Sequence, residues 1–93
     1  MTARLPAALE PVTDAAELLS RCEREERLAE GLHIRGADLS GTRFEGLRLR
    51  GVLFEGCRLT GCQWEHADLC DVVFRQCELS NSGWRDGFFE RAA

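Results

Sequence analysis

Residues 32–91 read, in groups of five, LHIRG, ADLSG, TRFEG, LRLRG, VLFEG, CRLTG, CQWEH, ADLCD, VVFRQ, CELSN, SGWRD and GFFER. The central residue of each pentad is large and apolar: Ile34, Leu39, Phe44, Leu49, Phe54, Leu59, Trp64, Leu69, Phe74, Leu79, Trp84 and Phe89. A period of five matches neither an α-helix, with about 3.6 residues per turn, nor a strand, which repeats every two residues. The pattern therefore predicts a chain that turns a corner in every pentad.

If four pentads close one square coil, residues twenty apart should stack. At that spacing the central residues form four columns: Ile34, Phe54, Phe74; Leu39, Leu59, Leu79; Phe44, Trp64, Trp84; and Leu49, Leu69, Phe89. One column is all leucine and another is all aromatic, as expected if like shapes pack over like. Short fixed periods are typical of solenoids, in which each unit buries its apolar face only against a neighbouring unit.

The residue two before each central residue should also point inward, because side chains two apart share one face of a strand. These residues are small or apolar: Leu32, Ala37, Thr42, Leu47, Val52, Cys57, Cys62, Ala67, Val72, Cys77, Ser82 and Gly87. One large and one small side chain per side is what dense packing in a narrow coil requires. The cysteines at these positions are predicted to serve as small hydrophobic residues in the reduced state.

The pentads resemble the units of pentapeptide-repeat proteins, which read approximately A(D/N)LXX. ADLSG at residues 37–41 and ADLCD at residues 67–71 match in full, and the other pentads match through their central and inward residues. The resemblance covers 60 of the 93 residues. It implies an all-β solenoid over residues 32–91, a right-handed quadrilateral parallel β-helix of about three coils. Trp64 and Trp84 stand where that family usually has Leu or Phe, so each is expected to bulge or tilt its coil.

The N-terminal third is predicted to cap the repeats. Residues 1–13 should form an extended lead-in, and residues 14–31 a capping helix that runs from about residue 15 to residue 30. Asp14 and Glu17 have the spacing at which both carboxylates satisfy free N–H groups at a helix start, and Gly31 would end the helix. Its apolar side consists of Ala15, Leu18, Leu19, Cys22 and Ala29. Such a stripe needs a surface, and the open first coil offers one; a helix that only tethers the repeats is the alternative.

Composition indicates one small soluble domain. The chain has 93 residues, 44% hydrophobic, with a formal net charge of −4 and a pI near 5.1. This balance argues against nucleic-acid binding, for which a basic stripe would be the signature. No apolar run is long enough to span a bilayer, and the N-terminus lacks a signal-like apolar core, so a cytoplasmic location is predicted.

The C-terminal end is predicted to be an interface. Trp84, Phe88 and Phe89 would lie on a terminal coil followed only by two alanines, and an open strand edge invites another chain. Some family members that inhibit topoisomerases dimerise through this end, so the resemblance implies a homodimer. A different protein partner, or a longer protein of which this chain is a piece, remains open.

The outward positions supply a second interface hypothesis. His33, Leu53 and Val73 form one outward column, and its aliphatic members could line a partner groove or be an ordinary exposed pair. Two further columns alternate in charge: Arg35, Glu55, Arg75 and Asp38, Arg58, Glu78. Pairing along these ladders predicts a self-neutralised surface rather than a recognition site.

Enzymatic and metal sites are not predicted. His33 and His66 have no cysteine pair at zinc-ligand spacing, and Cys70, beside His66, is the one nucleophile candidate. The glycines recur every five residues as corners rather than as a phosphate-binding loop, so no cofactor is predicted.

Two functions fit the sequence. The first is a non-enzymatic protein–protein interaction or scaffold module. The alternative, suggested by the resemblance, is a DNA mimic that binds a type II topoisomerase (gyrase). Three coils would give a rod of about 15 Å, under half of the ~34 Å of one duplex turn. Residues 32–91 also hold nine acidic and eight basic residues. Both features favour the interaction module.

Overall fold

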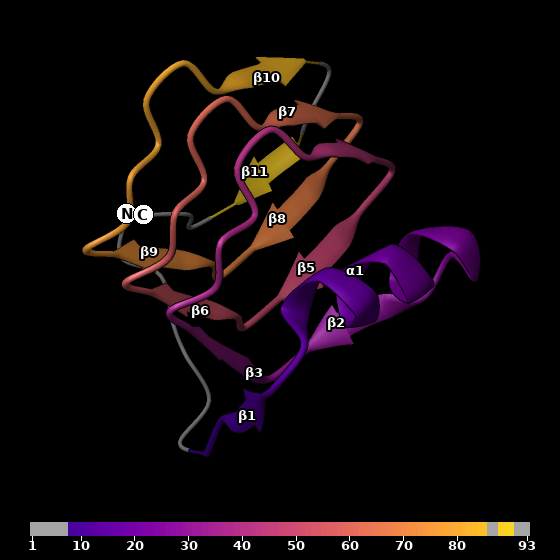
Figure 1. Ribbon diagram of the computed structural model, residues 1–93. Coiled ribbons are helices and arrows are strands. Elements are labelled where there is room, and N and C mark those ends of the chain that lie inside the picture. Colours follow the sequence, from indigo (N-terminus) through magenta and orange to yellow (C-terminus); the bar gives the residue numbers. More distant parts are fainter. Residues whose placement is uncertain (1–7, 86–87, 91–93) are drawn as a thin grey trace.

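The computed structural model describes residues 8–85 and 88–90, with side chains described as far as Trp84. The elements are β1 (Glu10–Val12), α1 (Ala15–Arg24), β2 (Leu28–Glu30), β3 (Leu32–Arg35), β4 (Arg43–Glu45), β5 (Arg48–Arg50), β6 (Leu53–Glu55), β7 (Gln63–Glu65), β8 (Asp68–Cys70), β9 (Val73–Arg75), β10 (Gly83–Arg85) and β11 (Phe88–Glu90). All pairings between these strands are parallel, in three sheets ordered β1-β3-β6-β9, β10-β7-β4 and β11-β8-β5-β2. Figure 1 shows the sheets as sides of one stacked coil.

The predicted twenty-residue register is confirmed. Ile34 pairs with Phe54 and Phe54 with Phe74 on one side of the coil. The fourth side has no named strand, but isolated bridges join Asp38 to Arg58 and Arg58 to Glu78 at the same spacing. The coil therefore has four sides, with a first coil over residues 32–51, a second over 52–71 and a third, the C-terminal coil, over 72–90.

Each corner from residue 31 to residue 81 uses a residue in the left-handed region, two positions after the central residue. Seven corners are glycine, from Gly31 to Gly61, with φ between 62° and 72°. The next four corners, His66, Asp71, Gln76 and Asn81, keep the same conformation with φ of 54° to 58°. Glycine adopts this conformation without steric cost, whereas other L-residues are strained in it. The last part of the repeat region therefore holds its corners at a conformational cost that the glycine corners avoid.

The small inward residues also donate hydrogen bonds. The thiols of Cys57, Cys62 and Cys77 donate to the carbonyl oxygens of Ile34 (3.3 Å), Leu39 (3.0 Å) and Phe54 (3.3 Å). Ser82 Oγ–H donates to Leu59 O at 2.8 Å. Each acceptor is the central residue twenty-three positions earlier, in the preceding coil. These residues thus satisfy carbonyl groups that face the interior, a role that their size alone did not reveal.

The aromatic column does not distort the coil, so the expectation that Trp64 and Trp84 bulge or tilt their coils was wrong. Phe44, Trp64 and Trp84 remain in ladder register. Trp64 stacks on Phe44 with ring centroids 4.4 Å apart and on Trp84 at 4.9 Å. Because the rings lie flat on one another, the column accommodates an indole without an extra residue. Phe54 and Phe74 meet Trp64 edge-on from the column on the opposite side of the coil, at 6.4 and 6.1 Å.

The capping helix is shorter than predicted. It ends at Arg24, because Glu26 takes a φ of 52°, and the residues expected to be its last turn form strand β2. β2 pairs with β5, and Ala29 stacks beneath Leu49. Residues 27–31, RLAEG, are therefore one more pentad, with alanine as the central residue. Repeat register overrides local helix propensity here, because Ala29 continues a buried column.

The lead-in contributes a strand as well. Residues 10–12 form β1, which pairs with β3 so that Val12 lies beside Ile34; residues 1–7 of the predicted lead-in lie outside the described residues. β1, α1 and β2 together make an N-terminal layer in which the helix replaces two sides of a coil. Seventeen residues separate Val12 from Ala29, against fifteen between their partners Ile34 and Leu49. A ten-residue helix can therefore replace two pentads with only two residues added.

α1 closes the N-terminal end of the coil (Figure 1). Asp14 begins the helix, and its side chain accepts a hydrogen bond from Glu17 N–H at 3.2 Å. Ala15, Leu19 and Cys22 are buried on the face that joins the core. The helix thus covers the apolar end of the first coil with a polar outer surface, as terminal repeats of solenoids require.

Candidate interaction sites

The two ends of the coil differ in how well their central residues are covered. Ile34, Leu39 and Phe44 in the first coil are at most 3% exposed, and their counterparts in the second coil are fully buried. In the C-terminal coil, Phe74 and Leu79 are half-buried and Trp84 is 40% exposed. The columns continue unchanged, and among the described residues only the N-terminal end has a covering element, α1.

The C-terminal end of the coil also presents open strand edges. β9, β10 and β11 are the last strands of the three sheets, and among the described residues nothing pairs with their outer edges. Phe88 and Phe89 lie in β11, where Phe89 pairs with Leu69, but their side chains lie outside the described part of the structure. The register nevertheless places Trp84 and Phe89 as neighbouring central residues of the C-terminal coil.

At the opposite end, a helix side chain covers a strand edge. Glu23 of α1 accepts a hydrogen bond from the backbone N–H of Glu45 on β4 at 3.0 Å. β4 is the first strand of its sheet, so this N–H would otherwise have no strand beside it. Burial raises the pKa of the Glu23 carboxyl, and the hydrogen bond from Glu45 N–H lowers it in part. Glu23 is a capping residue that the sequence did not reveal, because nothing local relates it to β4.

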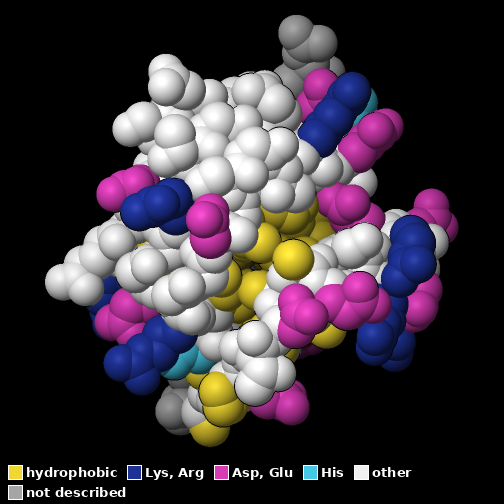
Figure 2. All heavy atoms as spheres, viewed as in Figure 1, with side chains coloured by type: hydrophobic (Ala, Val, Ile, Leu, Met, Phe, Trp, Pro, Cys, Tyr) yellow, Lys and Arg dark blue, Asp and Glu magenta, His cyan; other side chains and the backbone are white. Residues whose placement is uncertain are grey.

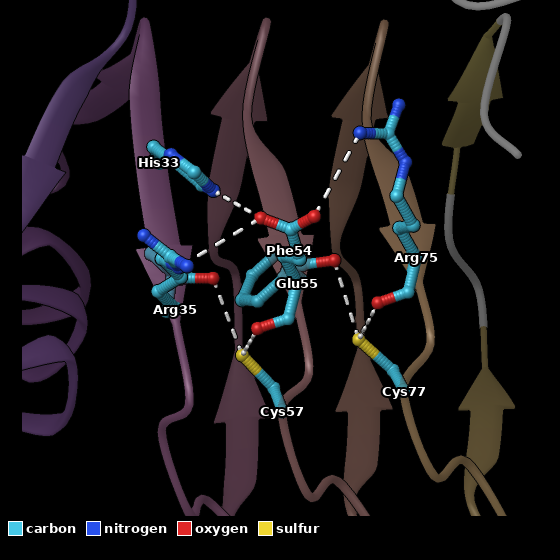
Figure 3. A network of polar contacts seen from close by, with 8 residues as sticks. His33, Arg35, Phe54, Glu55, Cys57, Arg75 and Cys77 are labelled. Carbon is cyan, nitrogen blue, oxygen red and sulfur yellow. Dashed lines mark hydrogen bonds and ion pairs between the residues drawn. The ribbon is translucent and has the colours of Figure 1, made fainter.

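The predicted charge ladders are confirmed as ion pairs for the Arg35, Glu55, Arg75 column and for the Arg58–Glu78 step of the second column. Glu55 lies between two guanidinium groups and one imidazole: Arg35 Nε is 3.9 Å away, Arg75 Nη1 is 3.8 Å away and His33 Nε2 is 2.9 Å away (Figure 3). On the next side, Arg58 pairs with Glu78 at 3.5 Å. These contacts join neighbouring coils, and exposed pairs of this kind contribute little binding energy to a partner.

The outward column His33, Leu53 and Val73 does not expose an aliphatic pair. Leu53 is 5% exposed, and His33 and Val73 are half-buried. Cross-strand neighbours on one face lie about 5 Å apart, close enough to cover a side chain between them. Leu53 is flanked in this way by His33 and Val73, so the hypothesis of an apolar groove loses its central residue.

The repeats match a known family model. Pentapeptide repeats are found in eight copies, over residues 30–56 and 48–82, which together span more than half of the chain. The chain belongs to the pentapeptide-repeat family. Pentapeptide repeats form right-handed quadrilateral β-helices, and the stacked parallel strands described above have that architecture. A comparison with curated proteins finds no match.

The described part of this pentapeptide-repeat protein holds no group of three His, Cys, Asp or Glu side chains placed to bind a metal ion. Cys70 and His66, the nucleophile and base considered above, lie on the second coil. Two hollows of about 320 and 260 Å³ instead border α1. Figure 2 shows hydrophobic atoms in a recess of the viewed face, with acidic side chains along its border. Among the described residues, α1 is too short and too polar to cross a bilayer.

Leu28 is an exposed apolar residue that the sequence reading missed. It is 43% exposed and lines the smaller hollow beside α1. The sequence analysis had placed it within the predicted helix. Extending the five-residue register back to residue 27 would have placed Leu28 at an outward strand position.

Proposed function

We propose that this pentapeptide-repeat protein is a non-enzymatic protein–protein interaction module that acts through its C-terminal coil, with a second copy of the chain as partner. The observation that supports this proposal most directly is the rise in exposure along the column of Phe44, Trp64 and Trp84, from 3% at Phe44 to 40% at Trp84. Apolar surface and open strand edges meet at the same end, and both are reduced when another chain covers them.

A two-fold arrangement suits this surface. Rotating one copy by a half-turn would set the terminal strands of the two copies edge to edge and bring the Trp84 rings towards each other, making a self-complementary interface. α1 covers the far end, which favours a closed dimer over a growing fibre. The five free cysteines are consistent with a reducing compartment, and we place the protein in the cytoplasm.

The interaction module is preferred over a DNA mimic for two reasons. The acidic side chains Glu55, Glu65 and Glu78 are paired with arginines, so they do not form an uninterrupted negative surface. The molecule measures 30 × 28 × 24 Å, which is not the shape of a rod. We therefore expect no inhibition in a topoisomerase supercoiling assay.

Sedimentation velocity over a concentration series tests the dimer. The wild type should sediment as a dimer, and Trp84→Glu should shift the equilibrium to monomer, because two carboxylates would face each other across the axis. Leu28→Glu is the matched control, since Leu28 has similar exposure (43%) but belongs to the N-terminal layer. A monomeric wild type at high concentration, or equal loss of dimer in both variants, would exclude the C-terminal interface.

A further inference from the structure

Two arginines differ from all the others whose side chains are described. Arg21, Arg24, Arg27, Arg35, Arg43, Arg58 and Arg75 each have a carboxylate oxygen within 3.9 Å. Arg48 and Arg50 make no ion pair with any described residue, although both are exposed. In a protein with a net charge of −4, two guanidinium groups on one strand that have no ion pair among the described residues are unexpected.

Both arginines belong to β5 and point outward from the same sheet. The central residue between them, Leu49, is 1% exposed, so the side chains on either side of it face solvent. On an extended strand, residues two apart lie about 6.6 Å from each other. The ladder neighbours of Arg48 are Leu28 and Asp68, and those of Arg50 are Glu30 and Cys70. The acidic neighbours on β2 and β8 therefore lie beside the pair without forming an ion pair with it.

We propose that the outer face of β5 binds an acidic, extended segment of another protein, with carboxylates two residues apart. An extended chain presents alternate side chains at the same ~6.6 Å repeat as Arg48 and Arg50, so each guanidinium can meet one carboxylate. The planar fork of arginine matches a carboxylate through two parallel hydrogen bonds. Leu28, 43% exposed and one strand from Arg48, offers an apolar contact beside the pair.

The charge pattern favours a protein segment over a nucleic acid. Nucleic-acid binding draws on many phosphate contacts along a broad basic surface. Here Glu30 and Asp68 stand on either side of a single cationic strand, so a continuous phosphate backbone would meet carboxylates on both sides. A short acidic segment along β5 needs only the two guanidinium groups, whereas a phosphate backbone would continue past them towards β2 and β8.

This surface is separate from the C-terminal interface. β5 lies in the first coil, two strands away from β11 in the same sheet. Loss of peptide binding and loss of self-association are therefore independent results, and a failed dimer test leaves this proposal intact.

A fluorescein-labelled peptide of alternating glutamate and threonine tests the proposal by anisotropy at low ionic strength. The wild type should bind it more tightly than an isomer built from an EETT repeat, which has the same composition but no two glutamates two residues apart, and added salt should weaken binding. Arg48→Gln combined with Arg50→Gln should reduce affinity about tenfold, which corresponds to about 1.4 kcal/mol for two exposed pairs.

The matched control is Arg24→Gln combined with Arg35→Gln. It removes the same charge from two exposed sites whose ion pairs are long, 3.9 Å each. Its affinity should change by less than about twofold. The proposal is overturned if this control loses as much affinity, if the EETT isomer binds equally well, if the wild type shows no binding, or if a short single-stranded oligonucleotide binds more tightly than the peptide.

Discussion

Replacing Trp64 with phenylalanine should leave stability nearly unchanged, although the side chain is completely buried. Trp64 is 0% exposed, stacked between Phe44 and Trp84, and its indole N–H has no hydrogen-bond partner among the described residues. The smaller ring would lose about 2 kcal/mol of apolar burial, at ~0.8 kcal/mol per carbon-sized group. The substitution also removes that buried N–H donor, and the desolvation penalty of a donor without a partner is about 1–3 kcal/mol. Its loss stabilises the variant by that amount. We expect a net change within about 1 kcal/mol.

Phe54→Leu is the matched control. Phe54 is also fully buried and in the second coil, and the substitution removes the same number of heavy atoms without removing a polar group. It should cost about 2 kcal/mol or more, because a cavity remains. Guanidinium denaturation followed by far-UV circular dichroism gives both values without relying on the fluorescence of the residue being changed. Equal losses in the two variants would refute the reasoning, since they would show that the indole N–H carries no penalty.

Three further predictions concern the cap, the thiols and the corners. Because burial raises the pKa of Glu23, its contribution to stability is full below the unfolded-state pKa and is lost as the pH rises through the folded-state pKa. Glu23→Gln should therefore gain unfolding free energy relative to wild type in urea titrations as the pH rises above about 4, the ordinary pKa range of glutamate, and a difference that stays constant with pH would contradict this. Iodoacetamide should modify half-buried Cys70 before Cys57, which is 2% exposed and has a pKa raised by burial; mass spectrometry that finds the reverse order would contradict the burial. Gly56→Ala should cost about 1 kcal/mol through backbone strain, because φ is 62° and nothing crowds the new methyl group, whereas Gln76→Gly at the corner above should cost almost nothing in the same denaturation assay; an unaffected Gly56→Ala would exclude strain at the corner.

The columns of the core could be predicted from the sequence because each central residue obeys one period. Leu59, flanked by Leu39 and Leu79, was identified as buried from spacing alone, and it is fully buried. The start of the coil was missed because its central residue is alanine. Ala29 occupies a central position, but alanine also favours helices, so local composition and repeat register pointed to different structures.

The contacts that close the N-terminal end could not be predicted. Glu23 reaches β4 only because of the direction in which α1 lies across the N-terminal end of the coil. No spacing in the sequence predicts that direction. The burial of Leu53 was missed because an outward strand position was equated with exposure. The column placed His33 and Val73 on either side of Leu53, but spacing alone does not show how far those two side chains cover it.

Equivalent residues in successive coils are always twenty apart, so every coil has the same length and a whole coil can be added without disturbing the others. Ile34, Phe54 and Phe74 are each followed by the same sequence of sides, so a duplicated twenty-residue segment inserted at any corner would keep each column continuous. An insertion of ten residues would shift every later residue by two sides of the coil, so a leucine column would continue on the opposite side of the square. The N-terminal layer does not share this freedom, because its seventeen-residue span fits only beneath a coil. Gene duplication can therefore lengthen the protein from within while the helical end stays fixed.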